Sequence, residues 1–318
     1  MAAQFQSFLG GETVCTRQIE NFSLSAWTEE RFRTMDALVF VGAAGIAVRA
    51  VAPCLRSKAL DPAVAAVDEG GRFVIPLVSG HLGGANDLAR ELAGICGGTA
   101  VITTATDVNG LFAVDEWAKR QNCAVPDPRG IKAVSGKLLD GGTVRIRSRW
   151  PVEGTPPERV ALTEESDWDV LVDIRRAEGG FCLVPRVLCL GVGCRIGTTP
   201  ESLEESFQAL CQEQGLWPEA VYGAATLDRK GKEPGLLEFC RRHGWDLRTY
   251  TPEELREVEG QFTASSFVEE ITGVDNVCER SAVLCAGGPL LTGKHSGNGI
   301  TMALAVRPVR LDWRWQYG

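Results

Sequence analysis

Short apolar segments alternate with amphipathic ones along the first third of the chain. Asp36–Val41 (DALVFV) is apolar at nearly every position and predicts a strand that is buried on both faces. Phe73–Val78 and Ala100–Thr103 predict two further strands. Between these two strands, apolar residues recur at helical spacing and predict a helix that begins near Gly84 and ends at Gly97.

The same alternation returns in the second half of the chain. Strands are predicted at Val187–Val192, Val221–Leu227 and Ile300–Val306. After the first of them, Thr198 or Thr199 is expected to cap a helix that carries Pro200 in its first turn. Strands that alternate with helices in this way are typical of parallel α/β units.

The segment between these two regions is less regular. A helix is predicted at Val114–Gln121 and an alternating strand at Thr143–Trp150 (TVRIRSRW). Pro151–Asp167 is rich in proline and acidic residues, so it predicts a loop or connector. Because 318 residues exceed one ordinary core, the predicted fold class is a multidomain α/β protein with two or three domains.

Composition narrows the classes of function. The apolar fraction of 44% and the charged fraction of 23% are typical of a globular protein. The net charge of -8 argues against a general affinity for nucleic acid. No apolar run reaches the roughly 18 residues that a membrane-spanning helix needs, so no membrane association is expected. Eleven scattered cysteines without a Cys-x-x-Cys pair predict a reduced, soluble, cytoplasmic protein.

The first candidate for chemistry is the turn Ser79–Asn86 (SGHLGGAN), between a predicted strand and a predicted helix. Open α/β sheets bind ligands at such strand ends. Gly80, Gly83 and Gly84 would let a ligand approach the backbone and would leave helix-terminal amides for an oxyanion. His81 could act as an acid or a base near neutral pH. A tight turn with a packed histidine explains the same residues equally well.

A second candidate follows the next predicted strand. Thr103, Thr104 and Asp107 lie in the segment TTATD, and Asp115 comes shortly after it. Two hydroxyl groups and a carboxylate could hold a water molecule or a polar edge of a ligand. For any one of these residues, helix capping or a local turn is the commoner role.

Basic residues form a third pattern. Arg145, Arg147 and Arg149 alternate along one predicted strand, so their side chains share one face. Guanidinium groups pair with carboxylates in bidentate fashion, and this face could bind several of them. A sheet edge protected by charge is the commoner explanation.

Two glycine-rich segments lie in the second half. Gly191–Gly197 (GVGCRIG) is one residue too long for a dinucleotide fingerprint, which disfavours nicotinamide binding. Lys294 and His295 lie in a predicted turn at Gly293–Gly299, and Glu279 lies in the helix before it. Either a binding loop or a plain turn fits this second segment.

Metal and triad chemistry find little support in the sequence. The three histidines, His81, His243 and His295, are not paired at metal-ligand spacing, so no protein metal site is expected. Ser79, His81 and Asp107 could supply the groups of a catalytic triad, but there is no Gly-x-Ser-x-Gly elbow.

Several longer segments share the motifs of one known family. They are Gly42–Arg49 (GAAGIAVR), Arg56–Lys58 (RSK), SGHLGGAN, Val101–Asp107 (VITTATD), Leu190–Arg195 (LGVGCR), and Glu279 with Lys294. Together they resemble the cobalamin-biosynthesis protein G family over nearly the whole chain. The resemblance implies an N-terminal α/β domain at residues 1–106, a small middle α/β domain with its connector at residues 107–186, and a C-terminal α/β domain at residues 187–318.

The resemblance also implies a reaction in anaerobic cobalamin (vitamin B12) biosynthesis. The δ-lactone on ring A of cobalt-precorrin-5A would be opened, giving cobalt-precorrin-5B and releasing acetaldehyde. Cobalt arrives inside the substrate, so the protein is expected to need no cofactor of its own. The expected partners are the corrinoid substrate and, transiently, neighbouring enzymes of the pathway.

For this reaction we expect His81 to act as general base and Asp107 as a second acid–base or orienting group, with backbone amides around Gly83 and Gly84 as oxyanion donors. The residues expected to bind substrate are Gly45, Arg49, Lys58, Ser79, Gly80, Gly83, Gly84, Asn86, Thr103, Thr104, Arg145, Arg147, Gly193, Cys194, Arg195, Glu279 and Lys294.

Two alternatives from other classes stay open. The first is a non-catalytic carrier of corrinoid intermediates. The second is a methyltransferase or nicotinamide enzyme of the same pathway, which the glycine spacing disfavours.

Overall fold

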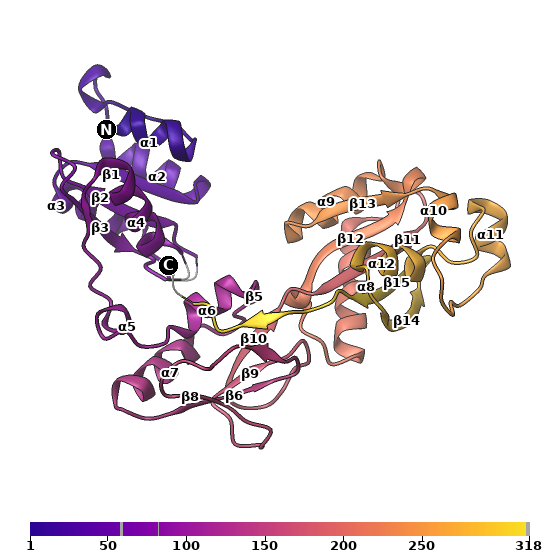
Figure 1. Ribbon diagram of the computed structural model, residues 1–318. Coiled ribbons are helices and arrows are strands. Elements are labelled where there is room, and N and C mark those ends of the chain that lie inside the picture. The colour runs from indigo at the N-terminus through magenta and orange to yellow at the C-terminus, as the bar shows by residue number, and fades with distance from the viewer. Residues whose placement is uncertain (58–59, 82, 316–318) are drawn as a thin grey trace. The chain divides into compact units, whose positions relative to one another are not determined.

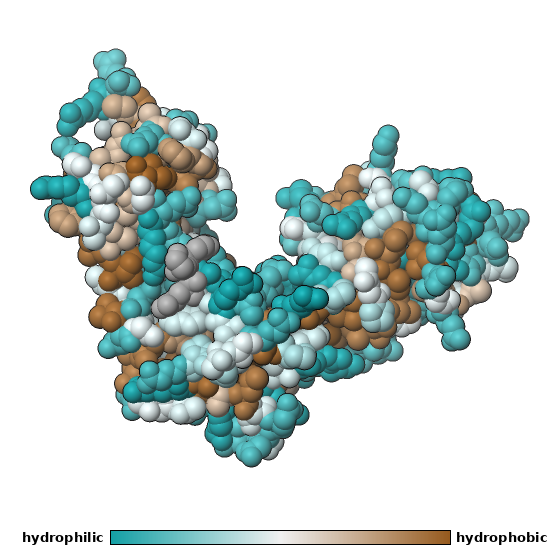
Figure 2. Space-filling view, viewed as in Figure 1, coloured by the Kyte–Doolittle hydropathy of each residue, from teal (hydrophilic) through white to brown (hydrophobic). Residues whose placement is uncertain are grey.

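The computed structural model of the protein describes residues 1–57, 60–81 and 83–315, and these separate into two compact units (Figure 1). The N-terminal unit contains residues 1–119, residues 131–142 and the chain from Arg314. The C-terminal unit contains residues 120–130 and 143–313. Among the described residues, no helix is long and apolar enough to cross a membrane. Hydrophobic and hydrophilic surface alternate on the visible face of each unit (Figure 2).

The N-terminal unit is built on a four-stranded sheet. Its strands, in spatial order, are β1 (Ala37–Val41), β2 (Ala63–Val67), β3 (Phe73–Val78) and β4 (Thr99–Ala100). β1 runs parallel to β2, and β3 runs parallel to β4, but β2 and β3 form an antiparallel pair. The carboxyl ends of β3 and β4 therefore lie at one edge of the sheet, and the carboxyl end of β1 lies at the opposite edge.

Helices cover this sheet and extend the unit. They are α1 (Ala2–Leu9), α2 (Leu24–Thr34), α3 (Ala44–Val51), α4 (Ala85–Cys96), α5 (Ala105–Val108), α6 (Val114–Arg120) and α7 (Arg129–Leu139), with short 3-10 helices η1 (Thr16–Gln18) and η2 (Ala52–Cys54). α4 begins after Gly84 and ends at Gly97, both in the left-handed conformation, as the glycine pattern predicted. Its buried Ala89 and Leu92 pack against Ala65 of β2.

The C-terminal unit contains two five-stranded sheets, and the first of them in the chain is the middle sheet. Its spatial order is β5 (Cys123–Ala124), β10 (Phe181–Pro185), β9 (Val170–Val172), β6 (Val144–Ser148) and β8 (Val160–Leu162). The prediction of one loop over residues 151–167 was wrong, because β8 and the short β7 (Val152–Glu153) lie within it. β7 pairs in parallel with β16 (Leu311–Asp312).

The C-terminal sheet has the order β13 (Asp246–Tyr250), β12 (Val221–Leu227), β11 (Leu188–Cys194), β15 (Ile300–Val306) and β14 (Leu290–Gly297). β11, β12 and β13 are parallel, whereas β15 is antiparallel to β11 and to β14. The turn predicted at residues 293–299 was wrong in extent, because β14 continues to Gly297 and only the residues around Gly299 turn.

Helices lie on both faces of the C-terminal sheet. They are α8 (Pro200–Glu213), α9 (Pro234–His243), α10 (Pro252–Arg256), α11 (Ser266–Thr272) and α12 (Cys278–Ala286), with η3 (Pro218–Ala220) and η4 (Asp228–Lys230). Leu190 packs with α8 and α9 on one face, and Cys189 packs with α12 on the other, as the two-residue period of a strand requires. A side chain at Gly191 would collide with the backbone of Cys278, so glycine lets α12 pack closely. The α/β multidomain fold class is confirmed; the predicted three-domain boundaries stay a prediction.

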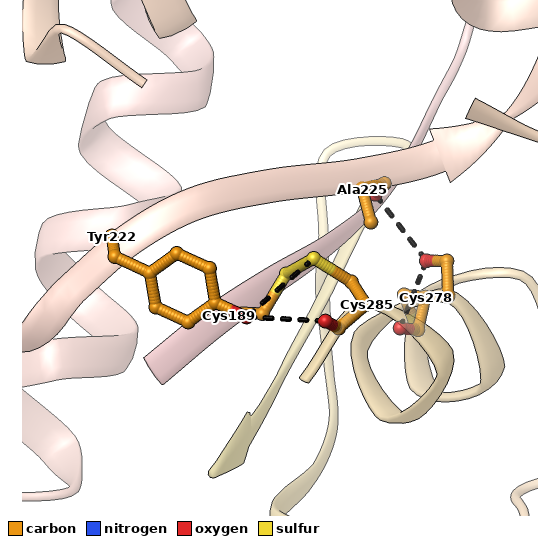
Figure 3. Close-up of a disulfide and its surroundings, with 6 residues drawn as sticks. Cys189, Tyr222, Ala225, Cys278 and Cys285 are labelled. Atoms are coloured by element: carbon orange, nitrogen blue, oxygen red, sulfur yellow. Dashed lines mark hydrogen bonds between the residues drawn. A yellow bond between two sulfur atoms is a disulfide. The ribbon is translucent and has the colours of Figure 1, made fainter. Parts of the chain in front are cut away.

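A disulfide joins Cys189 of β11 to Cys285 of α12, with their Cα atoms 6.3 Å apart (Figure 3). The hydroxyl of Tyr222 donates a hydrogen bond to the Cys285 carbonyl, 3.1 Å away. The expectation of reduced cysteines was therefore wrong for this pair. The two cysteines are 96 positions apart in the sequence, and the packing of α12 on the sheet brings them together.

Candidate active site

Two predicted turns meet at one edge of the N-terminal sheet. The turn Ser79–Asn86 follows β3, and the segment leading to Asp107 follows β4. The two strands are parallel, so both segments leave the sheet at the same edge. The Asn86 side-chain amide donates to the Thr104 hydroxyl at 3.0 Å and to Asp107 Oδ2 at 3.3 Å. Asn86 is buried and holds the two segments together.

The backbone of the first turn is tightly constrained. Ser79 has a positive φ of 58°, an uncommon conformation for this residue, and its hydroxyl donates to the carbonyl of Asp61 at 2.9 Å. A side chain at Gly83 would collide with the side chain of Ser79, so this position needs glycine. The Gly84 amide donates to the His81 carbonyl at 2.9 Å. Since that amide is already used, the predicted role of Gly84 as an oxyanion donor does not fit this conformation.

His81 lies between three carboxylates. Its Nε2 is 2.8 Å from Asp107 Oδ2, and its Nδ1 is 3.1 Å from Asp115 Oδ2. Glu116 Oε1 is 3.7 Å from Nε2. The histidine side chain is only 12% exposed. Both ring nitrogens therefore face carboxylate oxygens, an arrangement that favours an imidazolium with a proton on each nitrogen.

The electrostatics of His81 follow from these contacts. Burial by itself lowers its pKa, but the hydrogen bonds to Asp115 and Asp107 and the charges of Asp115 and Glu116 raise the pKa to about 9. Burial acts to raise the pKa of Asp107, yet the imidazolium and Arg90 outweigh it and lower that pKa. At neutral pH the resting site thus holds a protonated imidazole and an ionised Asp107.

Asp107 is fixed from a second direction. Arg90 of α4 donates to its Oδ1 at 2.6 Å, and the same guanidinium donates to Asp87 at 3.0 Å. This carboxylate therefore has a cation at each oxygen, His81 on one side and Arg90 on the other. Charge-assisted hydrogen bonds of this kind hold a side chain in one orientation.

Glu116 is a residue that the sequence reasoning missed. It lies in the first turn of α6 beside Asp115 and is 6% exposed. Among the described residues, its Oε1 has no hydrogen-bond partner. Burial, the largest effect, raises the pKa of Glu116 to about 7. The sequence did hold a signal for Glu116. Two adjacent acids, Asp115 and Glu116, interrupt an apolar segment between Ala113 and Trp117, and acidic residues are rarely found in segments that become buried.

His81, Asp107 and Glu116 have donor atoms within 4.8 Å of one another, a spacing that could accommodate a cation. In this structure both nitrogens of His81 and both oxygens of Asp107 are already engaged by protein groups. We therefore treat the group as a proton-exchanging cluster and assign no metal ligands to it.

The remaining residues predicted in the N-terminal unit lie apart from this cluster or at its margin. Gly45 is the second residue of α3, which follows β1 at the opposite edge of the sheet. Arg49 is exposed on the same helix. Thr103 is exposed next to the partly buried Thr104. Lys58 lies outside the described residues.

The other predicted residues belong to the C-terminal unit. Arg145 forms an ion pair with Asp167 at 2.7 Å, and Arg147 is exposed on the same strand. β6 lies between β9 and β8, so the interpretation of these arginines as guards of a sheet edge was wrong.

A separate group forms where β11 ends. Cys194 is the last residue of β11, Gly193 pairs with Thr301, and the Arg195 side chain lies over Gly299. Within the described part of the chain, neither Arg195 nor the Lys294 ammonium group forms an ion pair. Glu279 is buried, and its carboxylate accepts the Lys294 amide at 2.6 Å. The structure thus brings Gly193, Cys194 and Arg195 together, with Glu279 and Lys294 linked to each other.

Comparison with known proteins decides the family. The family model described as cobalamin synthesis G N-terminal matches residues 26–107, and the one described as cobalamin synthesis G C-terminus matches residues 188–305. The cobalt-precorrin-5A hydrolase of Salmonella typhimurium is 36% identical over 87% of this chain and 84% of its own length. The chain belongs to the cobalamin synthesis G family. The family predicted from the sequence motifs is therefore confirmed.

Further relatives in the cobalamin synthesis G family are more distant. The cobalt-precorrin-5A hydrolase of Priestia megaterium is 31% identical over 87% of this chain and 80% of its own length. A crystal structure of a cobalamin biosynthesis protein G homolog from Sulfolobus solfataricus covers 96% of this chain and 91% of its own, with 22% identity and a TM-score of 0.38. We base no conclusion on a structural likeness this low.

The two family-model matches include some of the candidate site residues and leave out others. The N-terminal match includes His81 and ends at Asp107, so Asp115 and Glu116 lie beyond it. Arg145 and Arg147 lie between the two matches, whereas Gly193 to Lys294 fall inside the second one. Only the three-dimensional structure joins Asp115 and Glu116 to the histidine.

Proposed function

We propose that this protein is a cobalt-precorrin-5A hydrolase of anaerobic cobalamin biosynthesis. It opens the ring A δ-lactone of cobalt-precorrin-5A, giving cobalt-precorrin-5B and acetaldehyde. Relatives with this name at 36% and 31% identity over most of the chain support the proposal. The observation that carries it in the structure is the buried imidazole of His81 between the carboxylates of Asp107 and Asp115.

His81 has two successive roles in the proposed mechanism. Water loses one proton to a carboxylate of the cluster as it adds to the lactone carbonyl. The imidazolium faces the oxyanion and gives its proton to the ring oxygen as the carbon–oxygen bond breaks. The neutral imidazole left by this step then acts as the general base. It removes the proton of the new hydroxyl group while the carbon–carbon bond breaks and acetaldehyde leaves. The electron pair passes to a macrocycle carbon, which takes up the proton that the attacking water lost.

Asp107 is proposed to hold His81 in the protonated, correctly oriented state. Its hydrogen bond with Nε2 and its ion pair with Arg90 keep Asp107 ionised. It therefore stabilises the imidazolium and does not itself take up the proton. The turn residues Ser79, Gly80 and Asn86 position the histidine. In this mechanism the substrate approaches the Nε2 side of the ring and takes the place of Asp107 Oδ2 at the Nε2 proton, while Asp115 keeps its contact with Nδ1.

Recognition of the macrocycle is proposed to depend on its many carboxylates. Arg49 and Lys58 in the N-terminal unit and Arg145 and Arg147 in the C-terminal unit would pair with these groups. Gly193, Cys194, Arg195, Glu279 and Lys294 form the second proposed binding region. The protein is proposed to act in the cytoplasm without a cofactor of its own, since cobalt belongs to the substrate, and to meet neighbouring pathway enzymes transiently.

The test is acetaldehyde release from cobalt-precorrin-5A under anaerobic conditions. We expect release by the wild type and a loss of about 100-fold or more in His81→Ala and Asp107→Ala. His243→Gln, which changes a histidine outside the proposed site, serves as the control and should retain wild-type turnover. Normal turnover by both site variants would contradict the assignment.

Two other outcomes point to other classes. Tight binding of cobalt-precorrin-5A by the wild type without acetaldehyde release would favour the non-catalytic carrier. Release that depends on an added cosubstrate would favour another enzyme class of the same pathway.

A further inference from the structure

Glu116 combines burial with an unpaired carboxylate oxygen. It is 6% exposed, and within the described residues its Oε1 receives no hydrogen bond. A buried polar atom normally has a partner, because leaving it unpaired costs free energy. The oxygen instead lies 3.7 Å from His81 Nε2, at the centre of the cluster. This position is suited to a group that gains and loses a proton during turnover.

The charges that face Glu116 come from three other elements. His81 approaches from the turn after β3, Asp107 from α5, and Asp87 and Arg90 from α4. Burial has the largest effect and raises the pKa of Glu116; Asp107 and Asp87 add to it, while His81 and Arg90 oppose it, giving about 7. A general base works best when its pKa lies near the pH of the reaction.

We propose that Glu116 is a further catalytic residue, the general base that takes a proton from the water molecule attacking the lactone. This inference rests on the proposed function. It divides the work of the site between two groups: Glu116 activates the nucleophile, and His81 protonates the leaving oxygen.

The step is balanced in protons and electrons. As the water oxygen bonds to the carbonyl carbon, one water proton passes to Glu116, and the ring carbon–oxygen bond then breaks with a proton from His81. In the second step the hydroxyl proton returns to His81 as the carbon–carbon bond breaks. Glu116 gives its proton to the macrocycle carbon that received the electron pair, so both residues regain their starting states and water is the only reactant consumed besides the lactone.

The test compares Glu116→Gln with the wild type in single-turnover acetaldehyde release from about pH 5 to about pH 10. The wild-type rate should rise as Glu116 ionises near pH 7 and fall as His81 loses its proton near pH 9. The isosteric glutamine should lower the rate by about 10²- to 10⁴-fold and abolish the acidic limb. Glu91→Gln, an exposed change on α4, is the matched control.

A second variant and a second measurement make the test decisive. Glu116→Asp keeps a carboxylate and should restore an acidic limb at a reduced rate. Difference infrared titration without substrate should show a carboxyl band that disappears near pH 7 in the wild type and is missing in Glu116→Gln. No such band, or acetaldehyde release by Glu116→Gln with an unchanged acidic limb, overturns the role of Glu116. No release by the wild type overturns the proposed function instead.

Discussion

Glu116 in the N-terminal unit and Glu279 in the C-terminal unit occupy similar positions in the chain's two folds. Each lies in the first turn of a helix, α6 or α12, and each is almost fully buried, with 6% and 1% of its surface exposed. Burial and helix position therefore do not separate them. The two glutamates differ in the hydrogen bonds that their carboxylate oxygens accept.

Every carboxylate oxygen of Glu279 is paired. Oε1 accepts from the Thr263 hydroxyl at 3.0 Å and the Lys294 amide at 2.6 Å, and Oε2 accepts from the Thr263 amide and the Asn276 side chain, both at 2.7 Å. Glu279 thus ties three segments of the C-terminal unit together. In contrast, Glu116 leaves one oxygen unpaired beside an imidazole. The donor set distinguishes a structural acid from one that is available to exchange a proton.

The largest expected effect tests the structural side of this comparison. Glu279→Gln should lower the free energy of unfolding of the C-terminal unit by about 2–4 kcal/mol, because the new amide group faces donors and the ionic hydrogen bonds are lost. Amide hydrogen exchange of α12 measures this locally. The exposed change Glu259→Gln should stay within about 0.5 kcal/mol of the wild type. A similarly small effect of Glu279→Gln would show that the four hydrogen bonds are not stabilising.

The sequence predicted the two site residues that follow adjacent strands. His81 and Asp107 meet because β3 and β4 are parallel. β3 was recognisable from its apolar composition, but the strand predicted at Ala100–Thr103 was wrong in extent, because β4 contains only Thr99–Ala100. β2 was missed, since its sequence AVAAV is mostly alanine, which has a low preference for strands. Without β2 the antiparallel pairing of β2 with β3 could not be predicted, so the sequence did not show that Gly45 and His81 lie at opposite edges of the sheet.

Glu116 and the donors of Glu279 illustrate what one sequence does not contain. Glu116 lies 35 positions after His81, and no local pattern relates a helix to a turn at that distance. Thr263 and Lys294 reach Glu279 from two other segments, whereas Asn276 lies only three positions before it. Such contacts depend on tertiary packing, so the chemistry of a buried acid is decided by residues that periodicity and spacing do not connect.

The next prediction sharpens the catalytic side through Asp115. Asp115→Asn should slow single-turnover acetaldehyde release by about 10- to 100-fold, because the imidazole of His81 loses the group that orients Nδ1. It should also move the alkaline limb of the pH profile to lower pH, since Asp115 helps to raise the pKa of His81. Asp115→Glu should partly restore both properties, and the exposed Asp140→Asn should change neither. An unmoved alkaline limb would exclude Asp115 as a positioning residue.

The smallest expected effect is a gain in stability from Glu116→Gln. The same type of change, glutamate to glutamine, is expected to destabilise the C-terminal unit at Glu279. The pKa of Glu116 rises from 4.5 to about 7 on folding, so the wild type loses stability as the pH rises from about 4.5 through about 7. Glu116→Gln does not ionise and avoids this loss. At pH 8 it should be more stable than the wild type by about 1–3 kcal/mol, and at pH 4 about equal to it. Urea unfolding with hydrogen exchange of α6 at both pH values measures the difference. Glu279→Gln should be destabilising at both, so an equal cost for the two glutamine variants would mean that Glu116 is a structural acid like Glu279.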